Sequence, residues 1–412
     1  MKKLRVAVVI DDFFPASGGI GRSVQTQLEE LTAMGHDVTL IAPDVKLEKP
    51  RIGHTIETPT YYINGLPAHL SILHHSQRRA KAISKQAQFD VVHTQTERGA
   101  LVLGAKIARL QNIPHIHTFH ANIAGTHQTV REACFGTLLY QVLILPLLRQ
   151  AAGRPRKKVK LPTMRQETGG FFARVDWMGF AAIADQVDGY TVPAPFMRDM
   201  IELCRDHRGQ GHVVPTGVNR QIVDVLRDMP RQRSDQRVRF LSMGRLAKEK
   251  RLDVMVKAFK RANLADAELV IVGDGDQRFK LRDLARGYPI DFRGHMSGVD
   301  ALAYELRNAD ALVLTSYRFD SQALVISEAV AAGLPVLYCD DRLTVATSPK
   351  TALLTGPDVK SLAHGFQRLM DAELRADMAR ATSAKLPELM PDRTAERFVE
   401  AYEELIERKA RG

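Results

Sequence analysis

Cysteine and tryptophan are scarce in this sequence. Only three of its 412 residues are cysteine, and tryptophan occurs once. The cysteines, Cys134, Cys204 and Cys339, are odd in number and far apart, so they provide neither a disulfide framework nor the ligand set of a zinc site. This usage is typical of a protein that works in a reducing cytoplasm.

Long apolar runs are also lacking. The run at 6–10 leads directly into two aspartates, which makes it too short for a signal peptide. The longest apolar stretch, 138–148, contains Gln141 and Pro146 and is shorter than the roughly 20 residues that a spanning helix needs. We therefore expect no helix that crosses a membrane.

A dinucleotide fingerprint is missing as well. The glycine-rich loop after the first apolar run reads GGIG at 18–21, which differs from GxGxxG. A nicotinamide dehydrogenase is the rival interpretation, because Asp44 follows the second predicted strand as the ribose-binding acid of such enzymes does. The missing fingerprint disfavours that interpretation.

The composition is otherwise that of a soluble, basic enzyme. Hydrophobic residues make up 45% of the chain, and 58 lysines and arginines against 47 acids give a formal charge of +11. Because 412 residues are too many for one core, we expect two domains, at 1–200 and 213–393. A last helix, 394–412, should pack back on the first domain through its regularly spaced apolar residues.

Apolar strands alternate with amphipathic helices in both halves of the chain. This pattern predicts an α/β protein with two doubly wound, Rossmann-like domains, whose ligands lie beyond the carboxyl ends of the strands in a central cleft. The strands are expected at 6–10, 38–42, 90–94, 113–119, 239–244, 269–275, 311–316 and 335–339.

One segment breaks the alternation and carries most of the net charge. Between 149 and 174, within an insertion at about 140–180, eight basic residues stand against one acid. Aromatic residues follow at Phe171, Phe172, Trp177 and Phe180. This combination predicts docking on an anionic membrane surface; a solvated loop and a nucleic-acid patch are the alternatives. The docking residues would be Arg154, Arg156, Lys157, Lys158 and Lys160.

The segment 319–336 is the most informative about function. It places Asp320 in a turn and Glu328 in a short helix that is otherwise apolar. A carboxylate in apolar surroundings needs hydrogen-bond donors, which sugar or ribose hydroxyls would supply. The helix N-terminus near 321–324 offers free backbone N–H groups to a phosphate. The structural alternative is a helix cap and an ion-paired helix residue.

Two cations, Arg245 and Lys250, lie in the loop after the first strand of the second domain. Both can converge on the N-terminus of the next helix, where they would neutralise a diphosphate; a solvated helix start is the alternative. The glycines of GDGD at 273–276 would permit close approach of the backbone to a ligand.

Three histidines, His115, His117 and His120, stand in and after one predicted strand of the first domain. No carboxylate or cysteine lies at ligand spacing from them, so we predict no metal site. His120, at the exit of the strand, is the one placed to touch a ligand.

Taken in order, GGIG, HTFH, VPTGV, GRLAKEK, VGDGD and FDSQALVISEA resemble the retaining glycosyltransferases of the GT-B fold, family 4, over essentially the whole chain. Within that family they are most similar to the bacterial diacylglycerol glucosyltransferases. The resemblance implies transfer of a hexose, with retention, from a nucleotide diphosphate sugar of the UDP-glucose type to a hydroxyl of a membrane lipid. It also implies a cytoplasmic protein, peripheral on the inner face of the membrane, with the acceptor in the first domain and the donor in the second.

The resemblance also implies roles for individual residues. Arg245 and Lys250 would hold the diphosphate, Glu328 the ribose, and Asp320 the transferred sugar, while His120 would lie beside the reacting sugar. No metal or other cofactor is expected. The donor-binding set would be Gly18, Gly19, Gly244, Gly273, Gly275, Ser321, Gln322, Ala323, Leu324 and Glu328.

Three positions depart from the family pattern. Asp320 replaces the usual glutamate, Ala323 a glycine, and Arg251 the glycine that follows Lys250. The shorter Asp320 leaves the identity of the hexose open. Two further functions remain as alternatives: the same chemistry on a soluble sugar or glycan, and a non-catalytic protein that binds carbohydrate or membrane.

Overall fold

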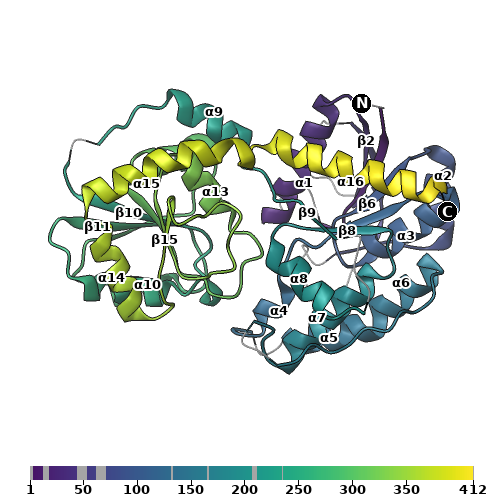
Figure 1. Cartoon of the computed structure of the whole chain (residues 1–412), viewed down its shortest axis with the longest axis horizontal. Coiled ribbons are helices and arrows are strands. Elements are labelled where there is room, and N and C mark those ends of the chain that lie inside the picture. The colour runs from purple at the N-terminus through teal and green to yellow at the C-terminus, as the bar shows by residue number, and fades with distance from the viewer. Residues whose placement is uncertain are drawn as a thin grey trace. The chain divides into compact units, whose positions relative to one another are not determined.

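A computed structural model describes residues 3–12, 18–43, 53–61, 71–130, 133–164, 167–206, 211–233 and 235–411. The chain divides into two compact units, one of Met1–Thr216 with Pro391–Gly412 and the other of Gly217–Met390. Each unit is built on one parallel sheet with helices on both faces (Figure 1).

The sheet of the first unit has the strand order β3-β2-β1-β6-β7-β8-β9. The order reverses between β1 and β6, which is the topological switch point where doubly wound sheets bind ligands. The loops after β1, β6 and β7 therefore end at one edge of the sheet. The strands are β1 (Arg5–Val9), β2 (Asp37–Pro43), β3 (His54–Thr58), β6 (Val91–Thr94), β7 (His115–Thr118), β8 (Gly189–Val192) and β9 (Gly211–Val213).

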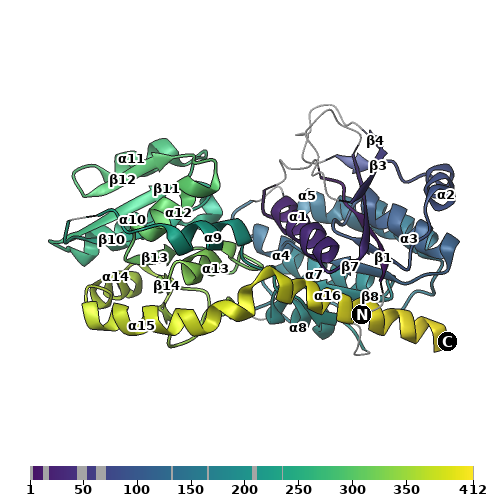
Figure 2. The same ribbon diagram turned by 90° about the horizontal axis from the view of Figure 1, so that it is seen from above.

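Alternate residues of β1 explain the layers of this unit. Val6 and Val8 face a core formed with α1 and α16, while Ala7 and Val9 face a core formed with α2 and α3. The two layers can be followed in Figure 2. The helices are α1 (Gly18–Ala33), α2 (Gln77–Gln86), α3 (Gly99–Gln111), α4 (Ile123–Thr126), α5 (Ala133–Leu139), α6 (Leu145–Ala152), α7 (Phe171–Ala184), α8 (Pro195–Leu203) and α16 (Pro391–Arg411). A short ribbon of β4 (Thr60–Tyr61) and β5 (Ile72–Leu73) completes the described part.

The sheet of the second unit has the order β12-β11-β10-β13-β14-β15, with its switch point between β10 and β13. Phe240 faces the core under α10 and α14, and Leu241 faces the core under α9, α12 and α13. Its strands are β10 (Val238–Met243), β11 (Ala267–Val272), β12 (Ile290–Gly294), β13 (Ala311–Leu314), β14 (Val336–Tyr338) and β15 (Ala352–Leu354). Its α-helices are α9 (Arg220–Asp228), α10 (Leu252–Ala262), α11 (Arg278–Ala285), α12 (Val299–Arg307), α13 (Leu324–Ala331), α14 (Val359–Arg368) and α15 (Ala372–Lys385).

The stretch Ala133–Ala152 differs from the sequence expectation. A π-helical turn at 140–144 joins α5 to α6, so the helix continues past Gln141 and Pro146. Proline lacks an N–H group, and the π turn just before it shifts the register of the hydrogen-bond ladder at that point. By length and composition alone, with a mean hydropathy of 1.3, this stretch is sufficient for a membrane-spanning helix.

The packing of α6, the C-terminal part of this helical stretch, argues against a spanning role. Leu145, Leu148 and Ala151 are buried in a core shared with α3 and α7. A helix that places one side in the core of a folded unit lies along the surface of that unit.

Two of the aromatic residues expected to touch a membrane are instead core residues. Trp177 is 1% exposed and Phe180 is 2% exposed. Both lie on α7 in the core of the first unit, where Trp177 packs against Phe180 and Phe180 packs against Phe119. The sequence expectation was wrong here because it judged these side chains by their neighbours along the chain and not by the face of the helix.

Candidate active site

The switch point of the second unit brings Arg245 and Lys250 together. Both line one pocket at the carboxyl ends of β10, β11 and β13, together with Gly244 and Thr315. The Thr315 hydroxyl donates to the carbonyl oxygen of Lys250 at 2.9 Å, which fixes the loop after β10 to the end of β13. Both residues line this pocket, and the convergence of their two charges on a diphosphate stays a prediction.

Lys250 and Asp320 form a partly buried ion pair. Lys250 Nζ donates to Asp320 Oδ1 at 2.6 Å, and the Ser316 hydroxyl donates to the other carboxylate oxygen. Arg245 is different, because its side chain is 67% exposed and pairs with Glu249. The site thus presents one cation already held by a carboxylate and a second at the surface.

Helix α13 begins at Leu324, with Ala323 at its N-cap, which is the place expected from the sequence. Glu328 lies in the middle of the helix and is 6% exposed. Ser321 and Gln322 precede the helix and are partly buried. The roles of these residues in binding a sugar, a ribose or a phosphate stay predictions.

The GDGD glycines serve a contact between two loops. A Cβ atom on Gly273 would lie 1.8 Å from the carbonyl oxygen of Gly244, and one on Gly275 would lie 2.5 Å from that of Leu246. The loops are also joined by backbone hydrogen bonds, from Leu246 N to the Asp274 oxygen at 2.9 Å and from Gln277 N to the Leu246 oxygen at 3.0 Å. The close approach predicted for a ligand is therefore, in the structure, an approach of one loop to the other.

Arg251 stands where the family pattern has a glycine, and the structure shows how the arginine is accommodated. Its φ is +51°, in the left-handed region that glycine adopts without a steric penalty. The guanidinium lies 5.7 Å from the ring centre of Tyr317 and donates to the Pro357 oxygen at 2.7 Å. These contacts offset part of the backbone cost.

In the first unit, His120 follows β7 at the same edge as the N-terminus of α1. Its Nε2 lies 2.7 Å from Gln95 Oε1. Removal from water lowers the pKa of His120 to about 4, so its ring is neutral at neutral pH. Helix α1 begins at Gly18, and a Cβ atom on Gly19 would meet open space. Ser17, which precedes the glycine-rich loop, lies outside the described residues.

His115 and His117 face inward from β7, and both rings contact the Thr94 hydroxyl. Within the described ranges, no group of three or more histidine, cysteine, aspartate or glutamate side chains could hold a metal ion.

Comparison with known proteins decides the family. Residues 17–222 match the model of Glycosyltransferase Family 4, and residues 227–385 match that of Glycosyl transferases group 1. The chain belongs to glycosyltransferase family 4. Its fold is GT-B: the sucrose-phosphate synthase of Thermosynechococcus elongatus superimposes with a TM-score of 0.69 at 19% identity, over 98% of this chain and 99% of that one.

Two relatives of known name match this chain over similar lengths. An alpha-monoglucosyldiacylglycerol synthase of Streptococcus pneumoniae is 24% identical over 81% of this chain and 70% of its own. A GDP-mannose-dependent alpha-mannosyltransferase of Mycolicibacterium smegmatis is 25% identical over 82% of this chain and 80% of its own.

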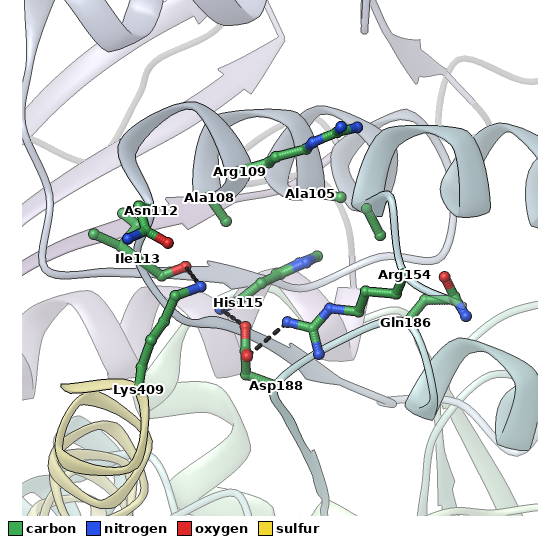
Figure 3. A pocket seen from close by; sticks show the side chains of 11 residues that line it. Ala105, Ala108, Arg109, Asn112, Ile113, His115, Arg154, Gln186, Asp188 and Lys409 are labelled. Atoms are coloured by element: carbon green, nitrogen blue, oxygen red, sulfur yellow. Dashed lines mark hydrogen bonds and ion pairs between the residues drawn. The ribbon is translucent and has the colours of Figure 1, made fainter. Parts of the chain in front are cut away.

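This family 4 glycosyltransferase has a second pocket with a volume of about 150 Å³. It lies at the edge of the first sheet where the strands begin (Figure 3). Arg154 points into it and pairs with Asp188 at 2.6 Å. Burial alone would raise the pKa of Asp188, but the hydrogen bond and charge of Arg154, together with the His115 backbone N–H and the charge of Lys409, lower it. Lys409 of α16 donates to the Ile113 oxygen at 3.2 Å. We therefore infer that Arg154 stabilises this edge of the sheet, and we remove it from the residues expected to dock on a membrane.

The glycosyltransferase should lose stability as pH falls from about 6.5. Burial lowers the pKa of His115 to about 3 and of His120 to about 4, and that of His93 lies well below its usual value. Below pH 6.5 the unfolded chain binds protons that the folded chain does not. Each histidine should then remove up to about 1.4 kcal/mol per pH unit from the free energy of unfolding.

Trp177, the single tryptophan, is buried in the first unit, so its fluorescence can follow urea unfolding of that unit. Between pH 6.5 and 5, His115→Gln should show a shallower decline of stability than wild type. Equal slopes would contradict the assignment of His115 as a buried neutral ring.

Proposed function

We propose that this family 4 glycosyltransferase transfers a hexose from a nucleotide diphosphate sugar, UDP-glucose in type, to a hydroxyl of a membrane lipid such as diacylglycerol, with retention at the anomeric carbon. The observation that carries the proposal is that Arg245 and Lys250 follow β10 in one loop at the switch point of the second sheet, with Asp320 bound to Lys250. The name of the Streptococcus pneumoniae relative supports a glucosyl donor and a diacylglycerol acceptor.

The geometry of the pocket suggests how the donor would bind. A diphosphate carries more negative charge than one carboxylate, so it competes with Asp320 for Lys250. Once released, Asp320 can accept hydrogen bonds from hydroxyls of the transferred sugar. Arg245, whose side chain is 67% exposed, would turn from Glu249 to supply a second charge to the diphosphate.

The same cations favour the chemical step. The bond between the anomeric carbon and the phosphate oxygen breaks while the acceptor oxygen attacks from the same face, and the leaving phosphate takes the acceptor proton. Negative charge grows on the diphosphate during this step, and positive groups fixed in advance lower its energy. We therefore expect turnover without a metal ion.

The proposal of a membrane lipid as acceptor is supported by the exposed surface of the helical stretch Ala133–Ala152. Its outward residues are apolar and exposed, with Phe135 at 72% and Val142 at 68%. Phe171 and Met164 are exposed in the same unit, and Arg156 and Lys158 are exposed in the loop after α6. Apolar side chains beside cations fit an anionic bilayer surface. We therefore assign the apolar part of the proposed docking surface to this helical stretch and no longer to Trp177 and Phe180.

Lys157 is also exposed. Lys160 is exposed as well and forms an ion pair with Asp206 at 3.1 Å. The basic part of the proposed docking surface centres on the three consecutive exposed cations Arg156, Lys157 and Lys158. Arg165 lies outside the described residues.

Vesicle sedimentation should reveal two separable contributions to docking. Wild type should pellet with anionic vesicles, and added salt should weaken but not abolish binding, because salt screens charges and leaves apolar burial intact. A variant with Arg156, Lys157 and Lys158 changed to serine should lose the salt-sensitive part. A variant with Phe135, Leu139 and Val142 changed to serine should lose the salt-resistant part.

The control for the apolar variant is Phe279→Ser, which removes a still more exposed phenylalanine from the second unit and should pellet like wild type. If wild type stays in the supernatant with every lipid, docking is wrong and a soluble sugar or glycan becomes the better acceptor.

The reaction itself can be tested with a panel of donors and acceptors. UDP-glucose and GDP-mannose, the latter suggested by the name of the Mycolicibacterium smegmatis relative, would each be incubated with diacylglycerol vesicles. Mass spectrometry identifies the product, and NMR gives its anomeric configuration. We expect an α-linked glucolipid, formed equally well with EDTA present. An inverted product would refute retention, and activity restored only by added Mg²⁺ or Mn²⁺ would refute metal independence.

A further inference from the structure

A chain of side-chain hydrogen bonds leads from the C-terminal helix to His120. Gln95, in the loop after β6, contacts His120 Nε2 through its Oε1 at 2.7 Å. Its Nε2 donates to Gln27 Oε1 at 2.9 Å, and Gln27 Nε2 donates to the Tyr402 hydroxyl at 2.8 Å. Four segments far apart in the sequence, α1, the loops after β6 and β7, and α16, thus meet in one network within the first unit.

The network is almost fully removed from water. Gln95, Gln27 and Tyr402 are 1%, 4% and 0% exposed. His93 lies beside them, with its Nδ1 at 2.7 Å from the Tyr402 hydroxyl and its Nε2 at 2.6 Å from the Thr118 hydroxyl. Because an unmade hydrogen bond is costly in such surroundings, each side chain holds the next in one orientation.

The direction of these bonds specifies the state of His120. The Gln95 amide oxygen can only accept, so the neutral ring of His120 must carry its hydrogen on Nε2. The other ring nitrogen, Nδ1, is then the basic one. A rotated imidazole or the opposite tautomer would break the bond to Gln95.

We propose that Gln95 is a positioning residue of the transferase reaction, which sets the orientation and tautomer of His120 and is itself held by Gln27 and Tyr402. This inference rests on the proposed function only for its consequence in turnover. The hydrogen-bond network exists independently of the substrate. None of the motifs that identify the family includes Gln27 or Gln95, which explains why sequence patterns do not reveal the network.

Kinetics of Gln95→Met provide the first test. Methionine keeps the length of the side chain but accepts no hydrogen bond from His120. We expect the kcat to fall about 10- to 100-fold, as for a displaced catalytic group, with the donor KM changed less than about twofold. The matched control is Gln111→Met, because the Gln111 side chain bonds to backbone groups of Ala87 and Phe89, and this variant should retain the kcat of wild type.

A double-mutant cycle separates positioning from a structural role. If Gln95 acts through His120, Gln95→Met should cause little further loss of kcat in the His120→Ala background. The same fold loss in both backgrounds would overturn the proposal.

Nitrogen NMR of histidine-labelled protein tests the tautomer without any substrate. The His120 signals, assigned by their loss in His120→Ala, should show a protonated Nε2 in wild type and a mixture of tautomers in Gln95→Met. A wild-type ring protonated on Nδ1, or identical signals in both proteins, would overturn the proposal. Absence of transferase activity with a correct tautomer would refute the proposed function alone.

Discussion

Replacing Gly273 by alanine should disrupt the contact between the loops that follow β10 and β11 in the second unit. The added Cβ would stand 1.8 Å from the Gly244 oxygen at a backbone φ of +139°, so one loop must move away from the other. Strain and overpacking together should cost about 3 kcal/mol or more. Nucleotide binding should weaken as well, because the displaced segment carries Arg245.

Gly287→Ala is the matched control for this substitution. Gly287 also has a positive φ, +81°, but no atom lies within 4 Å of its would-be Cβ. The free energy of unfolding of Gly287→Ala should therefore fall by only about 1 kcal/mol, the cost of the left-handed backbone conformation for a residue with a Cβ atom. Calorimetric melting and titration with UDP distinguish the two variants. Equal losses in both would mean that the contact between the loops contributes nothing.

Much of the fold could be predicted from local pattern. The run at 6–10 is apolar throughout and those at 38–42 and 239–244 are largely apolar; all three lie close to strands β1, β2 and β10. Strands buried on both faces need such runs, so the sequence reveals them. Helix α13 could be placed as well, because Gly333 follows it and its apolar residues leave few alternatives.

What could not be predicted depends on contacts between distant segments. Gly273 is needed because Gly244, 29 residues earlier, packs against it, and no local pattern records that distance. The ion pair of Lys250 with Asp320 spans 70 residues and forms only because β10 and β13 are neighbours. The signal for the burial of Trp177 was present, since Ala173, Trp177, Phe180 and Ala184 recur at helical spacing.

Lys250→Met should weaken binding of a nucleotide diphosphate by about 1.5 to 3 kcal/mol, roughly 10- to 150-fold in Kd. The substitution removes the charge while keeping most of the side-chain volume. Lys257→Met is the control, because Lys257 forms a similar ion pair with Asp253 at 3.1 Å on the exposed face of α10. That variant should bind UDP as wild type does.

Asp320→Asn tests whether the carboxylate competes with the diphosphate. It removes the competitor for Lys250, so UDP should bind at least as tightly as to wild type, while turnover with a nucleotide sugar should fall because the sugar loses a charged acceptor. Isothermal titration with UDP measures the first effect, and product formation measures the second. Weaker UDP binding in Asp320→Asn, comparable to that of Lys250→Met, would show that the pair acts as a structural unit. Wild-type affinity in Lys250→Met would remove this lysine from the donor site.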